Sequence, residues 1–258
     1  MCSGPSHRLP VSRTPLHDPV GEARRLAGAA EAAGLAVRVA GGVAIALRCP
    51  SAGRRPLQRT YADIDLAGRS KDRRGIVGLL TDLGYEADAQ FNALHGARRL
   101  FFWDAVNGRQ VDVFLDRFEM CHRIELLERL RAPGPTLPLA DLLLMKLQVV
   151  ETNAKDLSDI LTILVDHPFT EDDSGIDLPY LAGLAAADWG LWRTTTMIAE
   201  RADVFARSLE RFDRAQLVHD QVRRLLGALE DVPKSSGWRL RARVGERKRW
   251  YELPEERG

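Results

Sequence analysis

The stretch LAVRVAGGVAIAL occupies residues 35–47, and RTYADIDL follows at residues 59–66. The apolar run 35–40 predicts a short buried strand, and Gly41-Gly42 predicts a tight turn into a short helix over 43–47. Glycine lets the backbone turn sharply and approach a ligand closely. The first amides of the new helix carry partial positive charge, so this turn is a candidate site for a phosphate group.

The second segment places two aspartates side by side. Residues 62–67 read ADIDLA, and the period of two along a strand puts Asp63 and Asp65 on the same face. The competing interpretation is a solvent-facing strand edge, but apolar residues surround the pair and no lysine is adjacent. Two such carboxylates repel each other at neutral pH unless a cation lies between them. Mg²⁺ suits the pair, because it takes carboxylates, waters and substrate phosphates as ligands.

A third carboxylate is predicted on a neighbouring strand. Residues 98–104 and 109–115 are two apolar runs joined through Asn107-Gly108, which is a strong hairpin signal. Within the second run Asp112 shares its face with Phe114. Together with the two earlier aspartates, Asp112 would complete a cradle for two metal ions. One ion would activate an attacking hydroxyl and the other would stabilise a leaving oxygen.

The pattern changes to helix from residue 139 onward, after a break at Pro133 to Pro138. The fold class expected is α+β, with a mixed sheet and flanking helices followed by an all-helical C-terminal half. We expect a flexible N-terminal tail over 1–19, an α+β domain over 20–135, a helical domain over 136–232 and a basic tail over 233–258. The expected elements include helices at 20–33, 139–151, 154–166, 178–187, 191–212 and 214–229, a helix from a Ser70 cap to Leu83, and a strand at 85–92.

Two segments of the helical half carry candidate site residues. Lys146 is the only charge within LLLMKLQVV at 142–150, so it either reaches solvent or points at an anion. We expect it to bind phosphate, because lysine is a point-charge phosphate ligand. Asp156 and Asp159 lie one helical turn apart and are further candidates. The alternative for them is an ordinary set of charges on a helix surface.

Composition sets limits on the class of protein. The chain has 258 residues, 45% hydrophobic and 28% charged, as expected of an ordinary globular protein. No apolar run approaches the roughly 20 residues of a membrane helix, so no membrane partner is expected. Residues 1–19 lack the apolar centre of a secretory signal. Cys2, Cys49 and Cys121 show no metal-binding spacing, and we therefore expect a reducing, cytoplasmic location.

The formal net charge of +1 conceals an uneven distribution. Residues 1–60 and 234–258 are basic, whereas residues 141–188 carry ten acids and two lysines. This asymmetry suggests a basic surface for phosphates, although solvated charged faces give the same pattern.

The ordered set of motifs resembles the nucleotidyltransferase superfamily with the polymerase-β-type fold. Within it, the chain most resembles the AbiEii-like branch, whose members include toxins of type IV toxin–antitoxin systems. The resemblance covers roughly residues 35–165. It rests on GGVA at 41–44, RTYADIDL at 59–66, VDVF at 111–114, LLLMKLQ at 142–148 and KDLSDI at 155–160.

The resemblance implies that residues 20–135 form a nucleotidyltransferase catalytic domain. Asp63 and Asp65 would bind metal, with Asp112 as a third ligand or base. Lys146 would reach the triphosphate, and Asp156 or Asp159 would close the site. Gly41, Gly42 and Arg59 would complete the nucleotide-binding set.

The implied reaction moves a nucleoside monophosphate from a nucleoside triphosphate to an acceptor hydroxyl, with two Mg²⁺ as cofactor. An RNA acceptor, such as a tRNA 3′ end, fits the basic segments and the toxin branch, which also implies an antitoxin protein as a possible partner. The alternatives are a small-molecule acceptor such as an antibiotic, a protein acceptor, and a non-catalytic binding or antitoxin module.

Overall fold

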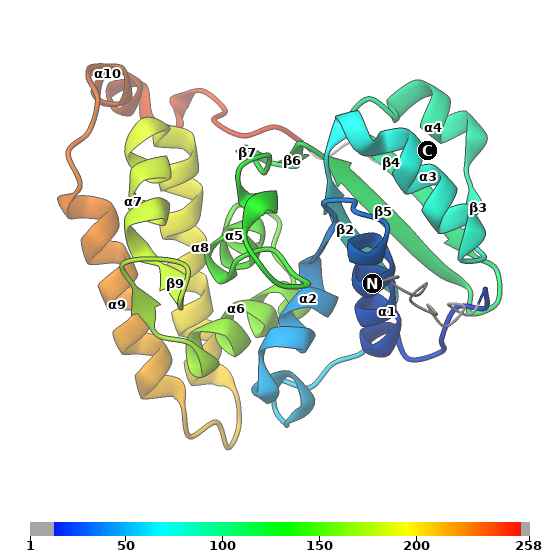
Figure 1. Cartoon of the computed structure of the whole chain (residues 1–258). Helices are drawn as coiled ribbons and strands as arrows, with labels where there is room; N and C mark the ends of the chain where they lie inside the picture. Colours follow the sequence, from blue (N-terminus) through cyan, green and yellow to red (C-terminus); the bar gives the residue numbers. More distant parts are fainter. Residues whose placement is uncertain (1–12, 254–258) are drawn as a thin grey trace, which may run out of the picture.

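A computed structural model describes residues 13–253, which form a sheet half and a helical half lying side by side (Figure 1). The main sheet has the strand order β1-β2-β5-β4-β3. Its strands are β1 (Arg38–Ala40), β2 (Asp63–Gly68), β3 (Glu86–Ala87), β4 (Arg99–Asp104) and β5 (Arg109–Leu115). Only β2 and β5 pair in parallel, so the sheet is mixed. The predicted α+β class, with flanking helices and a helical C-terminal half, is confirmed.

Four helices accompany the sheet: α1 (Pro19–Ala32), α2 (Gly41–Arg48), α3 (Arg73–Asp82) and α4 (Ala89–His95). Alternation along β5 points Val111, Val113 and Leu115 to a fully buried face. Ile76 of α3 packs on that face, since a Cβ built at Gly68 would meet Ile76 and Val113 together. The opposite face of β5 carries Asp112 and is the one on which the candidate site lies.

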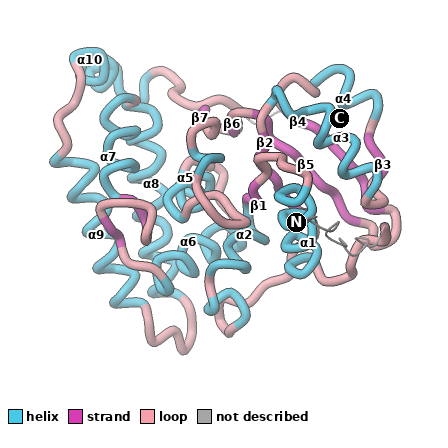
Figure 2. The backbone as a smooth tube through the Cα atoms, in the orientation of Figure 1, coloured by secondary structure: helices cyan, strands magenta, loops and turns pink. Residues whose placement is uncertain are grey.

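The helical half contains α5 (Leu139–Leu147), α6 (Ala154–Asp166), α7 (Leu178–Ala187), α8 (Trp189–Ser208), α9 (Ala215–Asp231) and α10 (Ser236–Val244), as Figure 2 shows. Two short ladders, β6 (Arg117–Glu119) with β7 (Arg123–Glu125) and β8 (Phe169–Thr170) with β9 (Ile176–Asp177), lie outside the main sheet. Single 3₁₀ turns are η1 (Pro50–Gly53), η2 (Ser70–Asp72), η3 (Arg129–Arg131) and η4 (Gly245–Arg247).

The two halves are joined through β1 and α2. The amide of Val39 donates to the carbonyl of Pro135 at 2.8 Å, and the amide of Leu137 donates back to Val39 at 3.0 Å. Helices α5 and α6 both pack against α2. The chain that enters the helical half is therefore attached to the strand from which the Gly41-Gly42 turn emerges.

Most predicted elements are present, with shifted ends. The helices over 154–166 and 178–187 and the 98–115 hairpin are confirmed, and the last two long helices run over 189–208 and 215–231. The first strand is shorter than predicted, at 38–40, and its helix begins at Gly41 itself. The predicted basic tail forms α10 and the 3₁₀ turn η4 and then continues without regular secondary structure; its last five residues lie outside the described residues.

Two predicted elements were wrong. The strand over 85–92 is limited to β3, because the Asp88 side chain accepts from the amide of Phe91 at 2.8 Å and starts α4. The helix predicted to begin at a Ser70 cap begins at Arg73 instead. Ser70 donates its amide to the Asp116 carboxylate at 2.9 Å, which holds it in the preceding 3₁₀ turn.

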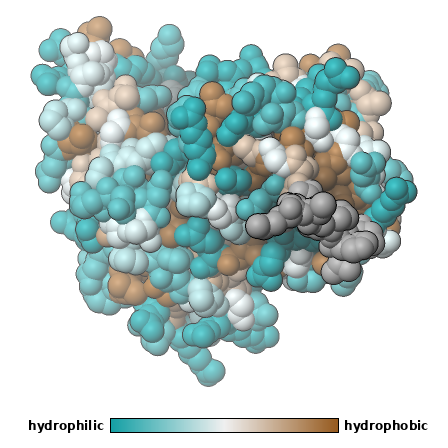
Figure 3. All heavy atoms as spheres, viewed as in Figure 1, coloured by the Kyte–Doolittle hydropathy of each residue, from teal (hydrophilic) through white to brown (hydrophobic). Residues whose placement is uncertain are grey.

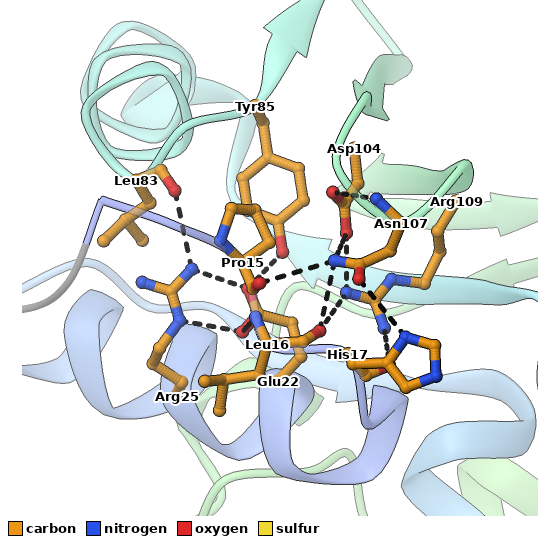
Figure 4. A network of polar contacts seen from close by, with 10 residues as sticks. All are labelled: Pro15, Leu16, His17, Glu22, Arg25, Leu83, Tyr85, Asp104, Asn107 and Arg109. Atoms are coloured by element: carbon orange, nitrogen blue, oxygen red, sulfur yellow. Dashed lines mark hydrogen bonds and ion pairs between the residues drawn. The ribbon is translucent and has the colours of Figure 1, made fainter.

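A buried carboxylate ties α1 to the sheet half (Figure 4). Glu22 is fully buried and accepts hydrogen bonds from Arg25 Nε at 2.8 Å, the Leu16 amide at 2.9 Å and the Tyr85 hydroxyl. Burial alone would raise the pKa of Glu22, but these hydrogen bonds and the Arg25 charge outweigh it and hold the pKa below 4.5. The carboxylate is therefore a structural anion and not a candidate for catalysis.

A second buried ion pair closes the β4–β5 hairpin over the N-terminal segment. Arg109 and Asp104 are both buried and lie 2.7 Å apart, and Arg109 also donates to the carbonyl of Leu16 at 2.8 Å (Figure 4). Part of the predicted flexible tail, around Leu16, is thus held on the fold. The remainder, residues 1–12 with Cys2, lies outside the described residues.

We expect Glu22→Gln to lower stability at neutral pH, by roughly 1.5–3 kcal/mol if it acts as a lost charged hydrogen bond. Because the folded-state pKa lies below 4.5, the unfolded chain binds the proton first as pH falls. The contribution of the carboxylate is complete above about pH 4.5 and is lost as pH falls through the folded-state value. Urea unfolding of wild type and Glu22→Gln from pH 7 to pH 3 should show that the difference in their free energies of unfolding decreases. A difference that does not change with pH would contradict the assignment of Glu22 as a buried anion.

One continuous apolar core runs through both halves. It includes Ile64, Phe102 and Leu115 of the sheet together with Leu142, Ile160 and other residues of the helices. On the face shown in Figure 3, hydrophilic residues predominate and hydrophobic residues are visible in smaller groups. Within residues 13–253, every helix is too short or too polar to cross a bilayer. Of the three cysteines, Cys49 and Cys121 are buried free thiols.

Candidate active site

The three predicted aspartates meet on one side of the sheet. Asp63 and Asp65 both lie on β2, and Asp65 is directly opposite Asp112 in the parallel β2–β5 ladder. Register partners in adjacent strands point to the same face, so all three side chains share that face. Asp63 is exposed, Asp65 is partly buried and Asp112 is buried, so the group extends from solvent into the molecule. Strand β1 pairs with residues 65–67 of β2, so the alternative of a solvent-facing strand edge is wrong for Asp65, whereas Asp63 lies beyond this ladder and is exposed.

Gly41 packs directly against Asp65. It has φ +60°, and a Cβ built there would overlap with the Asp65 carboxylate. Only glycine satisfies both conditions without strain. The preceding residue, Ala40, offers no side chain to cap α2, so the first amides of this helix keep their partial positive charge beside the aspartates.

Arg59 packs against Gly42, next to the contact between Gly41 and Asp65. A Cβ at Gly42 would overlap with the guanidinium of Arg59, which also stacks on the Tyr61 ring at 4.2 Å. Arg59 binds Asp159 through two parallel hydrogen bonds, Nε to Oδ1 at 2.8 Å and Nη2 to Oδ2 at 2.7 Å. The loop after α2 is thereby connected to α6.

Lys146 lies between two carboxylates of α6. Its Nζ is 2.7 Å from Asp156 Oδ1 and 3.0 Å from Asp159 Oδ2. Burial alone would lower the pKa of Lys146, but the two aspartates outweigh it and raise the pKa above 10.5, so the side chain is a cation. The alternative in which Asp156 and Asp159 form an ordinary helix-surface set is wrong for Asp159, which is buried and paired with two cations.

The pKa of Asp65 depends on the neighbouring aspartates of the sheet and on Lys146 of the helical half. The pKa of Asp65 is raised from 3.8 to about 7, first by burial and then by the charges of Asp63 and Asp112. Lys146 and Arg99 act in the opposite direction. A carboxylate that close to two others and that poorly solvated is stabilised by a cation.

Arg99 is a site residue that the sequence did not single out. Its Nε donates to Asp112 Oδ1 at 2.8 Å, and its guanidinium lies over the Phe114 ring at 5.0 Å. The hairpin turn at Asn107-Gly108 could have predicted this contact. It fixes the register that sets Phe101 opposite Asp112, and Arg99 lies two residues further along the same face.

The donor set is suited to Mg²⁺, although the ligands are not gathered into a closed cage. Within residues 13–253, no three acidic, histidine or cysteine side chains converge closely enough to hold a metal by themselves. Mg²⁺ is usually held by one or two carboxylates together with waters and substrate phosphates. Asp63 and Asp65 match that pattern, and Asp112 stands beside them with one oxygen bound to Arg99.

All nine predicted site residues therefore belong to one connected region. Gly41 and Gly42 contact Asp65 and Arg59; Arg59 reaches Asp159, which shares Lys146 with Asp156; Asp63 and Asp112 flank Asp65. They come from α2, the following loop, β2, β5, α5 and α6, elements spread over more than one hundred positions. Formally, five carboxylates face the three cations Arg59, Arg99 and Lys146, an excess of two negative charges when all are ionised.

Comparison with known proteins adds little to this geometry. The sequence matches no protein-family profile and no curated protein sequence. Two solved structures from Helicobacter pylori align with most of the chain. One is JHP933, at 13% identity over 86% of this chain and 97% of that chain, with a TM-score of 0.37. The other is described as a candidate nucleotidyltransferase, at 12% identity over 84% and 97%, with a TM-score of 0.36. At such low scores the argument about function rests on the site itself.

Proposed function

We propose that this protein is a metal-dependent nucleotidyltransferase that moves a nucleoside monophosphate from a nucleoside triphosphate to an acceptor hydroxyl. The observation that carries the proposal is the juxtaposition of Asp63, Asp65 and Asp112 with the uncapped start of α2. A group of carboxylates beside the uncapped N-terminus of a helix is a combination that favours binding of a metal–triphosphate complex. The sequence resemblance to polymerase-β-type nucleotidyltransferases supports the same reaction.

In this proposal different residues bind the phosphates, the metal ions and the acceptor hydroxyl. The amides of Gly41 and Gly42 bind phosphate oxygens, and Lys146 and Arg59 supply positive charge from α5 and from the loop before β2. Asp63 and Asp65 hold Mg²⁺, with Asp112 as a third ligand or as the base that accepts the hydroxyl proton. When bound, two such ions would polarise the α-phosphate and neutralise the leaving pyrophosphate.

The reaction is an in-line displacement. The acceptor oxygen forms a bond to the α-phosphorus as the bond to the bridging oxygen breaks, and pyrophosphate departs with the electron pair. Because there is little covalent work for side chains, positioning and charge stabilisation dominate catalysis.

The charge balance of the site explains why metal would bind before or with the triphosphate. The site has a formal excess of two negative charges, which repels a polyanion. Two divalent ions would reverse that sign. Triphosphate binding should therefore be weak in EDTA.

The acceptor we propose is the 3′ end of an RNA, such as a tRNA, and the biological role is that of a cytoplasmic toxin restrained by an antitoxin. The resemblance to the AbiEii-like branch and the basic segments of the chain support this choice. The chain would be divided into a catalytic domain over 20–135 and a helical domain over 136–232, with the site between them.

The test is a transfer assay that leaves the acceptor open. The purified protein is incubated with Mg²⁺ and each α-labelled triphosphate in turn, together with total RNA, an aminoglycoside panel or candidate proteins. Label on RNA supports the full proposal; label on a small molecule or protein keeps the chemistry and replaces the acceptor. A folded protein that transfers no label to any pool, and binds no triphosphate, would favour the non-catalytic alternative.

A further inference from the structure

The chain after α10, residues 245–253, begins with the 3₁₀ turn η4, passes along α8 and is called here the C-terminal strap. It is held at three points: Glu246 pairs with Arg193 at 2.6 Å, Trp250 Nε1 donates to Thr194 Oγ1 at 3.0 Å, and the Glu252 amide donates to the carbonyl of Cys121 at 3.0 Å. In Figure 1 the strap runs in red from α10 to the region of β6 and β7.

Aromatic packing makes the strap part of the fold. The Trp250 ring lies edge-on to Trp189 of α8 at 6.0 Å, and to its neighbour Tyr251 at 5.4 Å. The strap passes so close to α8 that a Cβ at Gly190 would lie 2.7 Å from the Trp250 carbonyl oxygen. Tyr251 therefore packs against Trp250, which is itself anchored to α8.

The last described part of the strap forms a wall of a cavity beside the candidate active site. The cavity has a volume of about 240 Å³ and is lined by Met120, Cys121, Val149, Val150, Glu151, Asn153, Asp156, Tyr251 and Leu253. Its lining includes Asp156, the carboxylate that binds Lys146 Nζ at 2.7 Å. A whole drug-sized ligand usually needs roughly 300–1,000 Å³, so this space fits one ring system of a larger molecule.

Four cations precede the part of the strap that lines the cavity. Arg243 lies in the last turn of α10, and Arg247, Lys248 and Arg249 follow it on the strap, all four exposed. The cations are followed directly by the aromatic pair Trp250 and Tyr251, and Arg249 lies 5.9 Å from the Tyr251 ring. Cations that follow a backbone together with aromatic rings on which bases stack are the combination that binds single-stranded nucleic acid.

We propose that the C-terminal strap and this cavity form the acceptor site for single-stranded RNA. The four exposed cations bind the phosphates of the strand, and the 3′-terminal base enters the cavity and stacks on Tyr251. The 3′ hydroxyl then lies on the Lys146–Asp156 side, toward the aspartates. This inference rests on the proposed function, because it is the proposed transfer reaction that places an acceptor 3′ end beside the aspartates.

RNA binding tests the site without requiring catalysis. A short 5′-fluorescent RNA is titrated with the full-length protein in EDTA, without triphosphate, and anisotropy gives the dissociation constant. Tyr251→Ala should weaken binding roughly 5- to 150-fold, the range expected when one base no longer stacks on an aromatic ring. Tyr251→Phe, which keeps the ring, should bind within about twofold of wild type.

The terminal base is identified by a double-mutant cycle. An RNA whose last nucleotide is abasic should bind more weakly by about the same factor as Tyr251→Ala, and the combination should bind little more weakly than either change alone. Additive effects would show that Tyr251 contacts something other than the terminal base, and would overturn that part of the assignment.

The role of the cations has its own readout. Replacing Arg243, Arg247, Lys248 and Arg249 with glutamine should reduce the slope of log affinity against log salt by about 0.7 for each phosphate that no longer binds a cation. Arg223→Gln with Arg224→Gln is the control for a general loss of surface charge, because these two exposed arginines lie on α9 and not on α10 or the strap. An unchanged slope in the strap variant, or an equal change in the control, would overturn the assignment.

The two proposals can fail separately. RNA binding through the strap with no nucleotide transfer would sink the proposed function and leave an RNA-binding site. Transfer to another acceptor, with no RNA bound, would sink the strap assignment and leave the chemistry. If Tyr251→Ala weakens triphosphate binding in Mg²⁺ instead of RNA binding, the cavity holds the incoming base, and the acceptor assignment is wrong.

Discussion

We expect Asp65→Ala to abolish the proposed nucleotidyl transfer, with a loss of roughly 10³-fold or more, and to leave the protein folded. We expect the same of Asp63→Ala. In the proposed mechanism each substitution removes a ligand of the metal ions that would neutralise the developing charge, and such electrostatic stabilisation is commonly the largest contribution to catalysis. Single-turnover transfer of labelled nucleotide measures the loss, and circular dichroism with urea unfolding checks the fold.

The stability of these variants separates a catalytic role from a structural one. The pKa of Asp65 is raised from 3.8 to about 7, so in the metal-free protein the folded state binds more protons than the unfolded chain between these two values. The stability of the folded state therefore falls as pH rises through this window. Asp65→Asn should be at least as stable as wild type at pH 8, although inactive.

The matched control is Glu86→Ala, which removes an exposed carboxylate from β3 of the same sheet. It should keep full activity and nearly full stability. Full activity in Asp63→Ala or Asp65→Ala would refute the metal-cradle assignment. Loss of activity together with collapse of the fold in both would instead assign the aspartates to the structure.

We expect Gly41→Ala to move Asp65 away from the start of α2. The new methyl group would overlap with the Asp65 carboxylate, and φ +60° is strained for alanine by roughly 1–2 kcal/mol. The Asp65 side chain must move, so we expect at least a 100-fold loss of transfer, since displacements of about 1 Å can cost that much. Initial rates and a magnesium titration measure the effect.

Gly108→Ala is the control that introduces backbone strain without the steric overlap that Gly41→Ala creates with Asp65. Gly108 has φ +63°, but a Cβ built there meets nothing within 4 Å. This variant should lose a similar amount of stability and keep its activity. Equal activity losses in the two variants would show that general destabilisation, and not the position of Asp65, explains the result for Gly41→Ala.

Local patterns were sufficient for much of the sheet half. The period of two in ADIDLA placed Asp63 and Asp65 on one face, and the Asn107-Gly108 turn placed β4 beside β5. Both depend on interactions between residues close in sequence, which a pattern records directly. The Asp88 cap of α4 was missed because residues 85–92 carry no periodic apolar signal strong enough to oppose a strand prediction.

The helical half was harder to connect to the site. The sequence identified Lys146 as an unusual charge on an apolar helix, and Asp156 and Asp159 as a pair one turn apart. It could not show that Arg59 reaches Asp159 or that Lys146 lies between both aspartates. These contacts join residues about one hundred positions apart or on two different helices, so they depend on how α2, α5 and α6 pack.

The candidate site residues other than Arg99 were predictable from the chain alone, because side-chain type, strand periodicity and turn signals are local properties. Tertiary packing decided the rest: that Gly41 touches Asp65, that Arg99 engages Asp112, and that the C-terminal strap brings Tyr251 to a cavity lined by Asp156. The physical reason is that burial and charge pairing act through space. The separation of two residues along the chain says nothing of their distance until the core has brought the elements together.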